Sequence, residues 1–216
     1  MFKNFKKLFL DLIFPSFCVS CGKDGSYLCK KCVNNVQIKS NSLELNKSAY
    51  LKGVISATNY QNKTIQKAIK IFKYQFSEEL GKSLAEVIRK KLIQCMKLSK
   101  KFIFIPVPLH KKRYKWRGFN QSELLSIYLA EKYKTLSVNL LKKIKHTKAQ
   151  AKLSKKARLQ NLKNAFSIQD VDIEIPKTTR IFIIDDVVTT GTTLNECAKI
   201  LYKNGYKNIY GLTICG

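Results

Sequence analysis

The sequence predicts an α/β fold, a doubly wound and mainly parallel sheet, with a small four-cysteine module before it. Short apolar segments of strand length alternate with amphipathic segments of helix length from residue 53 to residue 215. Four cysteines lie together within residues 18–32. The chain has 216 residues, 45% of them hydrophobic, which suffices for one well-packed domain and a small appendage. We expect an N-terminal helix and the cysteine module in residues 1–38, and the main domain in residues 51–216.

The first half of the main domain is expected to hold a strand, two helices, a second strand, a basic loop and a third helix. In that order, these elements are expected at residues 53–60, 64–76, 77–98, 102–108, 109–118 and 120–133. Pro106 and Pro108 end the second strand, because proline cannot donate a ladder hydrogen bond. Asn120 is suited to cap the N-terminus of the third helix.

The second half is expected to alternate in the same way. Strands are expected at 136–144, 180–187 and 208–215, with a helix at 193–205 that Gly205 ends. Residues 142–158 contain eight Lys and Arg side chains and no acidic one. We therefore expect that segment to be partly mobile and too polar for a core element.

The N-terminus imitates a signal peptide, with early lysines and an apolar run. Asp11 and Pro15 interrupt the run, and no cleavage site of small residues follows. A short amphipathic helix is expected here, with one face formed by Phe2, Phe5, Leu8 and Leu12, and interfacial membrane contact stays open. No apolar run approaches the roughly 20 residues that cross a bilayer, so we expect no integral membrane segment.

The charge balance is strongly basic. Lys and Arg number 41 against 14 acidic residues, a formal net charge of +27, which disfavours cationic substrates. Arginine occurs at five positions: Arg89, Arg113, Arg117, Arg158 and Arg180. Much of the lysine excess is interpreted as solvated surface, so the clustered basic residues carry the case for nucleic-acid contact.

Cys18, Cys21, Cys29 and Cys32 form two CxxC pairs whose sulfurs can enclose a tetrahedral Zn²⁺. Four protein ligands close the coordination sphere, so the metal would be structural. A reduced, metal-free pair of CxxC turns is the alternative. The other cysteines, Cys95, Cys197 and Cys215, stand alone, which favours a reducing cytosol over a disulfide framework.

Residues 181–193 place two carboxylates, Asp185 and Asp186, at the carboxyl end of a buried strand, where open α/β sheets bind ligands. A hydroxyl-rich turn into a helix follows, and helix N-termini bind phosphate. Carboxylates that can bind a diol, next to a turn that can bind phosphate, suit a ribose 5-phosphate as the ligand. The alternative is a threonine-rich turn after a core strand with incidental acids. The candidate ligand-binding residues are Asp185, Asp186, Val188, Thr189, Thr190, Gly191, Thr192 and Thr193.

All positions from Ile181 to Thr193 fit the phosphoribosyl-pyrophosphate signature of type I phosphoribosyltransferases, which this segment resembles. The resemblance implies that Asp185 and Asp186 bind the ribose hydroxyls as catalytic residues. It also implies that Thr189–Thr193 bind the 5′-phosphate and that Mg²⁺ accompanies phosphoribosyl pyrophosphate. The expected fold is accordingly a type I phosphoribosyltransferase-like sheet.

Other blocks resemble the competence protein F (ComF) family over nearly the full length. They are Pro106–His110, Arg113, Arg117–Ser122, Thr147, Gln150, Leu153, Arg158, Asn161, Ala165, Phe166 and the four cysteines. The resemblance implies a cytoplasmic protein that handles incoming single-stranded DNA in natural transformation. Single-stranded DNA, a sugar phosphate, and a competence helicase or uptake protein are the implied partners.

Three of the five arginines fall in these matched blocks, where a planar guanidinium gives bidentate contacts that lysine cannot make. The residues expected to bind pyrophosphate or nucleic-acid phosphate are Arg113, Arg117, Lys148, Lys152 and Arg158. Packing of the arginines on Trp116 or Tyr114 is the alternative. Phe119 is expected in the core rather than as a base-stacking platform. No catalytic role is expected for His110 or His146, which have no evident carboxylate partner.

Three functions remain open from the sequence. The first is a DNA-handling competence protein with a phosphoribosyl-pyrophosphate-type pocket. The second is an active, amidophosphoribosyltransferase-like enzyme of unknown acceptor, since no base-recognition element is recognisable after the strand at 208–215. The third is an adaptor with a vestigial pocket.

Overall fold

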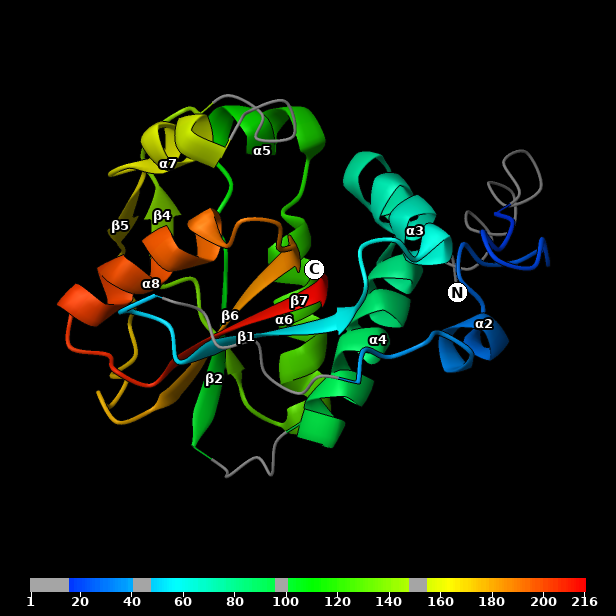
Figure 1. Cartoon of the computed structure of the whole chain (residues 1–216), viewed down its shortest axis with the longest axis horizontal. Helices are drawn as coiled ribbons and strands as arrows, with labels where there is room; N and C mark the ends of the chain where they lie inside the picture. The colour runs from blue at the N-terminus through cyan, green and yellow to red at the C-terminus, as the bar shows by residue number, and fades with distance from the viewer. Residues whose placement is uncertain (1–15, 41–47, 96–100, 148–154) are drawn as a thin grey trace.

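The computed structural model describes residues 16–40, 48–95, 101–147 and 155–216 (Figure 1). The helix expected near the N-terminus lies outside the described residues. Within these ranges, no helix is both long enough and apolar enough to cross a membrane.

A five-stranded sheet with the strand order β1-β7-β6-β2-β3 forms the centre of the molecule. Its strands are β1 Gly53–Thr58, β7 Ile209–Cys215, β6 Arg180–Val187, β2 Phe102–Pro106 and β3 Leu136–Ser137. Every neighbouring pair in it is parallel. Two short strands, β4 Leu141–Lys143 and β5 Phe166–Ile168, pair antiparallel beside it. The predicted doubly wound, mainly parallel sheet is confirmed.

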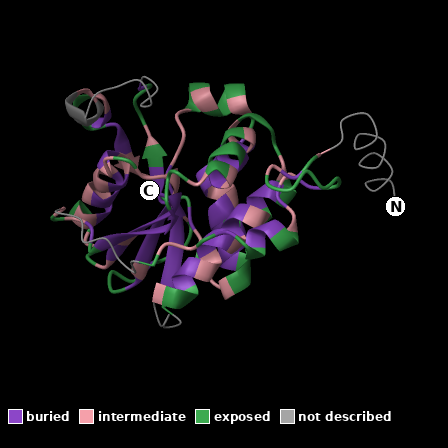
Figure 2. Cartoon of the chain, turned by 45° about the vertical axis from the view of Figure 1, so that its right-hand side comes forward, coloured by how far each residue is buried: buried purple, intermediate pink, exposed green. Residues whose placement is uncertain are grey.

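Helices cover both faces of the sheet, and the strands between them are buried (Figure 2). On one face, α3 Lys63–Tyr74, α4 Glu78–Cys95 and α6 Gln121–Tyr133 pack against Phe104 and Phe182. On the other, α8 Thr192–Lys203 packs against Ile181 and Ile183. Successive residues of β6 face opposite layers because side chains alternate along a strand.

The connections reverse direction between β2 and β6. From β2 the chain runs through α5 Lys111–Arg117 and α6 to β3, whereas from β6 it runs through α8 to β7 on the other side. The two strands pair with Pro106 opposite Ile184, so the segments that follow them leave the same edge of the sheet. Such a topological switch point is where open α/β sheets bind ligands.

The basic loop predicted at 109–118 is wrong, because residues 111–117 form the helix α5. His110 caps it by accepting a hydrogen bond from the Lys112 N–H at Nδ1, 3.3 Å away. Gly118 ends it in the left-handed conformation, φ +80°, which glycine adopts without strain. None of its residues is fully buried, so the helix has no apolar periodicity by which the sequence could reveal it.

The strand predicted at 136–144 is divided in the structure. Residues 136–137 form β3 in the main sheet, whereas residues 141–143 form β4 in the second sheet. The basic segment 142–158 is also not wholly irregular, because it contributes Lys142 and Lys143 to β4 and its last residues to α7 Lys155–Leu162. A turn stabilised by the hydrogen bond from Leu140 N to Val138 O redirects the chain from one sheet to the other.

Candidate functional site

The two aspartates occupy the carboxyl end of β6, beside the switch point. Asp186 faces α3, where its Oδ2 forms an ion pair with Lys73 Nζ at 2.7 Å. Asp185 accepts two hydrogen bonds at Oδ1, from Ser122 Oγ at 3.3 Å and from its neighbour's N–H, that of Asp186, at 2.9 Å. Groups from α3 and α6 therefore offset part of the electrostatic repulsion between the two adjacent carboxylates.

Asp185 lies in an environment that disfavours its ionised form. Burial, reinforced by the adjacent Asp186 carboxylate, raises the pKa of Asp185 well above its usual range. Lys73 shows the opposite balance, since burial lowers its pKa but the nearby Asp186 carboxylate outweighs that effect and raises it. A buried, partly compensated negative charge at this edge favours ligands that bring hydroxyl donors or a cation.

The loop after β6 leads from Val188 into α8. Val188 donates its N–H to Cys215 O at 2.9 Å, and Gly191 adopts φ +70° at the helix N-terminus. Thr190 Oγ1 and Thr192 Oγ1 lie 2.9 Å apart. Among the residues that the structure describes, no acceptor meets the backbone N–H of Thr190, Gly191 or Thr192. Thr189 and Thr193 each have an interaction partner already.

Unpaired amides at the start of a helix make a local positive end that suits an anion. Here they open beside the acid pair on the same sheet edge, since β6 supplies the acids and the loop after it supplies the amides. The residues expected to bind ribose and phosphate are thus brought to one edge.

The two arginines of α5 lie one helical turn apart but contact different groups. Arg117 Nη1 donates to Gln121 Oε1 at 2.6 Å, and its buried Nε has no hydrogen-bond partner among the described residues. Burial lowers the pKa of Arg117, and the Asp186 carboxylate opposes that effect, so the guanidinium lies within electrostatic reach of the acid pair. Arg113 Nη2 donates to the backbone oxygen of Thr147 at 3.2 Å.

The alternative of cation–π packing has no support in the described parts of the chain, where neither guanidinium lies over an aromatic ring. Lys148 and Lys152 lie outside the described residues. Of Arg158, only its place in α7 is described.

Asn120 joins the segments that follow β2. Its side-chain Nδ2 donates to Val107 O at 3.0 Å, while its Oδ1 accepts from the Ser122 N–H at 3.2 Å as the N-cap of α6. Ser122 is thereby fixed where its hydroxyl reaches Asp185. The predicted helix cap is confirmed and also serves to position a neighbour of the acid pair.

Sequence reasoning missed two cations near the acids, Lys73 and Lys143. Burial, with a contribution from the Arg113 charge, lowers the pKa of Lys143 to about 8, although Cys197 and Asp185 act in the opposite direction. Its Nζ lies 5.3 Å from the centroid of the Phe166 ring. Nothing in the sequence distinguishes either lysine from many others in a chain this rich in lysine, because tertiary packing alone selects them.

His110 and His146 also come together, with ring centroids 5.1 Å apart. Burial, with the His146 and Lys112 charges, lowers the pKa of His110. Phe119 is buried and lies against Phe72 and Phe76, which confirms its predicted place in the core.

The four predicted zinc ligands converge. The sulfurs of Cys18, Cys21, Cys29 and Cys32 all lie within 4.8 Å of one another. The sulfurs of Cys21 and Cys29 are 3.8 Å apart, which equals the edge of a tetrahedron with Zn–S bonds of about 2.3 Å. The four-thiol set therefore fits a structural zinc ion.

The backbone prepares this site for a thiolate. Burial alone would raise the pKa of Cys18, but hydrogen bonds from the backbone of Cys29, Cys21 and Ser20 outweigh it and lower that pKa to about 6. The Cys29 N–H lies 3.5 Å from the Cys18 sulfur. A thiolate at near-neutral pH is the form that binds a metal.

The cysteine module packs directly on α4. Leu28 and Val33 belong to the same hydrophobic cluster as Leu84 and Ile88 of that helix. Lys90 Nζ adds hydrogen bonds to the α2 Lys30–Asn34 segment, at Val33 O (3.1 Å) and Asn34 Oδ1 (2.8 Å). A cavity of about 500 Å³ opens here, lined by Asn34, Val36, Ile38, Lys90, Ile93 and Gln94. It involves neither the acid pair nor the threonine loop.

Known proteins resemble the chain along much of its length. It is 35% identical over 202 residues to competence protein F of Haemophilus influenzae, covering 91% of this chain and 82% of that protein. It is 32% identical over 148 residues to competence protein ComFC of Streptococcus pneumoniae, covering 68% and 62%. It is 39% identical over 116 residues to DNA utilization protein YhgH of Escherichia coli, covering 51% of this chain and 48% of that protein. No family model matches the chain.

The doubly wound parallel sheet and the N-terminal four-cysteine cluster agree with the predicted class, an α/β protein of phosphoribosyltransferase-like fold. The identity to competence protein F extends over more than two thirds of that relative. The chain belongs to the competence protein F family.

Proposed function

We propose that this protein handles incoming single-stranded DNA in the cytoplasm during natural transformation. The observation that carries the proposal is the 35% identity to a protein named competence protein F over 82% of its length. A relative named for DNA utilization matches the same chain over a shorter stretch. The net charge of +27 supports the proposal, because phosphate neutralisation by Lys and Arg provides most of the affinity for nucleic acid.

We further propose that the switch point binds a phosphorylated pentose of the phosphoribosyl-pyrophosphate type. In this proposal, Asp185 and Asp186 accept hydrogen bonds from the ribose hydroxyls, while the N–H groups of Thr190, Gly191 and Thr192 donate to the 5′-phosphate. Arg117, which already lies within reach of the Asp186 charge, would bind the pyrophosphate. The ribose must share or displace the Lys73 partner of Asp186.

The residues present also fit the Mg²⁺ that such a ligand carries. Two carboxylates adjoin, and burial together with the Asp186 charge raises the pKa of Asp185, so a cation that offsets the repulsion between the two ionised groups would be favoured there. Mg²⁺ bound with the pyrophosphate would offset the negative charge of the ligand.

An active phosphoribosyltransferase is the second candidate, and the unpaired amides beside the acid pair favour it over a vestigial pocket. In that reaction the bond from ribose C1 to the pyrophosphate oxygen breaks, pyrophosphate leaves with the bonding electrons, and an acceptor attacks C1. Arg117 and the threonine loop would stabilise the separating charges by position alone.

Thermal shift separates these proposals. Phosphoribosyl pyrophosphate with Mg²⁺ is expected to raise the melting temperature of the wild type but not of the Asp185→Asn/Asp186→Asn variant. A single-stranded oligonucleotide is expected to stabilise both if DNA binds elsewhere on the chain. Affinity for the oligonucleotide should fall steeply with salt, by about 0.7 log K per log salt for each phosphate neutralised. A flat salt profile would contradict DNA handling, and pyrophosphate release would establish turnover.

A further inference from the structure

Large aromatic side chains are exposed next to the proposed pocket. Trp116 is 69% exposed, Tyr74 64%, Phe76 60% and Tyr114 46%. Contiguous exposed apolar groups are uncommon on a protein surface and mark binding sites. Neither the fold nor the pocket explains why these rings face solvent.

Two of the rings form a defined pair. Tyr74 is the last residue of α3 and Trp116 lies in the last turn of α5, and their ring centroids are 6.1 Å apart at an interplanar angle of 87°. Phe76 is held differently, because its ring packs edge-on against the buried Phe119 at 5.2 Å. The edge-to-face pair, termed here the aromatic pair, thus joins the ends of two helices while most of both rings stays exposed.

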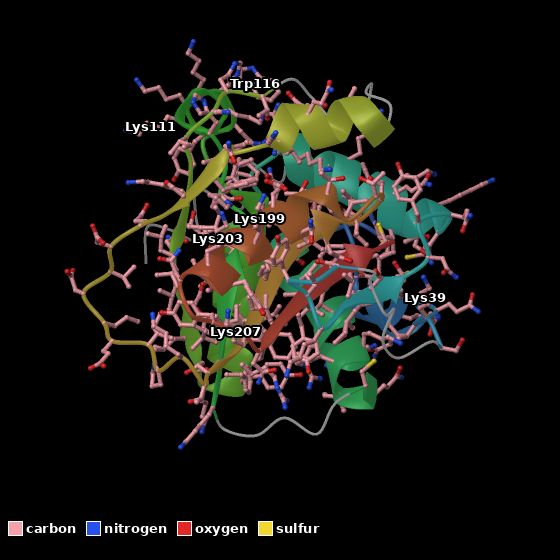
Figure 3. The ribbon with its side chains drawn as sticks, turned by 60° about the vertical axis from the view of Figure 1, so that its left-hand side comes forward. Lys39, Lys111, Trp116, Lys199, Lys203 and Lys207 are labelled. Atoms are coloured by element: carbon pink, nitrogen blue, oxygen red, sulfur yellow. The ribbon has the colours of Figure 1, made fainter. Side chains whose placement is uncertain are left out.

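The aromatic pair lies beside a concentration of positive charge on α5. Five of the seven residues of α5 are basic, namely Lys111, Lys112, Arg113, Lys115 and Arg117, and none is acidic. Figure 3 shows Trp116 and Lys111 near the upper edge of the molecule in that view. Exposed aromatic rings among cations fit single-stranded nucleic acid, whose bases stack on rings while its phosphates bind the cations.

A protein partner fits this surface less well. The cores of protein–protein interfaces are depleted in charged residues, and lysine in particular is under-represented there. On α5, lysines both precede and adjoin Trp116, at positions 111, 112 and 115. Charge complementarity therefore selects a polyanion with stackable faces.

We propose that Tyr74 and Trp116 form a base-stacking platform for single-stranded DNA beside the acid pair. The proposal rests on the proposed DNA-handling function and assigns residues to it. Lys73, which precedes Tyr74, pairs with Asp186, and Arg117, which follows Trp116, lies within electrostatic reach of the same acid. The platform and the pocket are therefore adjacent along both α3 and α5.

Trp116 is the only tryptophan in the chain, so its fluorescence reports on the platform directly. Titration with an oligodeoxythymidylate of about 12 nucleotides is expected to quench it. Trp116→Ala and Tyr74→Ala should each weaken binding by roughly 5- to 150-fold, the usual range for the loss of one stacked base. Trp116→Phe keeps a ring and should recover most of the affinity. Tyr60→Ala removes a ring that is 50% exposed after the edge strand β1 and serves as the matched control.

Salt dependence distinguishes stacking from charge. Trp116→Ala should lower affinity without changing the slope of log K against log salt, whereas Lys115→Ala should reduce that slope by about 0.7. The phosphoribosyl-pyrophosphate shift should be unchanged in Trp116→Ala, which shows that the variant is folded.

Two results would contradict the base-stacking platform and leave the proposed DNA function intact. In the first, the wild type binds the oligonucleotide and both alanine variants bind it with the same affinity. In the second, Trp116→Ala and Trp116→Phe lose affinity equally. The first would assign the rings to a protein partner instead. Absence of wild-type binding even at low salt would overturn DNA handling itself.

Discussion

Asp185→Asn is expected to stabilise the unliganded protein at pH 8 while it removes a proposed ribose contact. Burial and the Asp186 carboxylate raise the pKa of Asp185 from 3.8 to about 7. A carboxyl whose pKa is higher in the folded state contributes stability below its unfolded pKa, and that stability is lost as the pH rises through the folded pKa. The ionised carboxylate is therefore destabilising above about pH 7.

The magnitude follows from the same values. The difference between 3.8 and about 7 corresponds to an upper value of about 4 kcal/mol in unfolding free energy at pH 8. Asparagine retains an oxygen that can accept the hydrogen bonds from Ser122 and the Asp186 N–H. For a chain of this length, the full effect would raise the melting temperature by roughly 10 °C.

Urea unfolding of both proteins at pH 5 and pH 8 measures the effect, which should be larger at pH 8. Asp186→Asn is the matched control, and it should act in the opposite direction. It deprives the partly buried Lys73 of its partner at 2.7 Å, at a cost of about 1 kcal/mol or more. If Asp185→Asn were the less stable protein at pH 8, or if its advantage did not depend on pH, the electrostatic argument would be refuted.

Three further predictions concern other parts of the molecule. One zinc per chain is expected by elemental analysis. Cys21→Ser alters an exposed thiol and should release the zinc. Loss of zinc, by this variant or by a chelator, should lower the melting temperature, because the cysteine module shares a hydrophobic core with α4. Burial lowers the pKa of Lys143 from 10.5 to about 8. The wild type should therefore lose stability as the pH falls through this range, and its unfolding free energy in urea should be higher at pH 10 than at pH 7. Lys143→Met should remove this contribution to the difference. A Cβ at Gly211 would lie 2.8 Å from Leu194 Cδ1, so Gly211→Ala should reduce the unfolding free energy by about 1–3 kcal/mol, and an unchanged denaturation midpoint would contradict this packing.

The elements predicted most accurately are those with a strong pattern in the local amino-acid sequence. The apolar run before Asp185 predicted β6 at the bounds observed, and Asn120 marked the start of α6. The position of the acid pair at the sheet edge followed from the rule that parallel α/β sheets bind ligands at their carboxyl ends. In these segments, local sequence and tertiary structure favour the same conformation.

The features that escaped prediction depend on contacts between distant segments. The α5 helix has no fully buried residue, so it has no apolar periodicity to detect, and only its His110 cap and Gly118 terminus define it. Lys73 meets Asp186 from a helix more than a hundred residues earlier in the chain. The exposed Trp116 gave no indication of its pairing with Tyr74, because exposure and partners are properties of the fold.

Consecutive positions at the end of α3 connect the two proposed ligand sites. Lys73 holds the acid that a ribose would contact, and Tyr74 carries half of the aromatic pair. A sugar phosphate that draws Asp186 away from Lys73 would change the restraint on the final turn of α3 and with it the geometry of the rings. By thermodynamic reciprocity, the factor by which the sugar phosphate alters DNA affinity equals the factor by which DNA alters sugar-phosphate affinity.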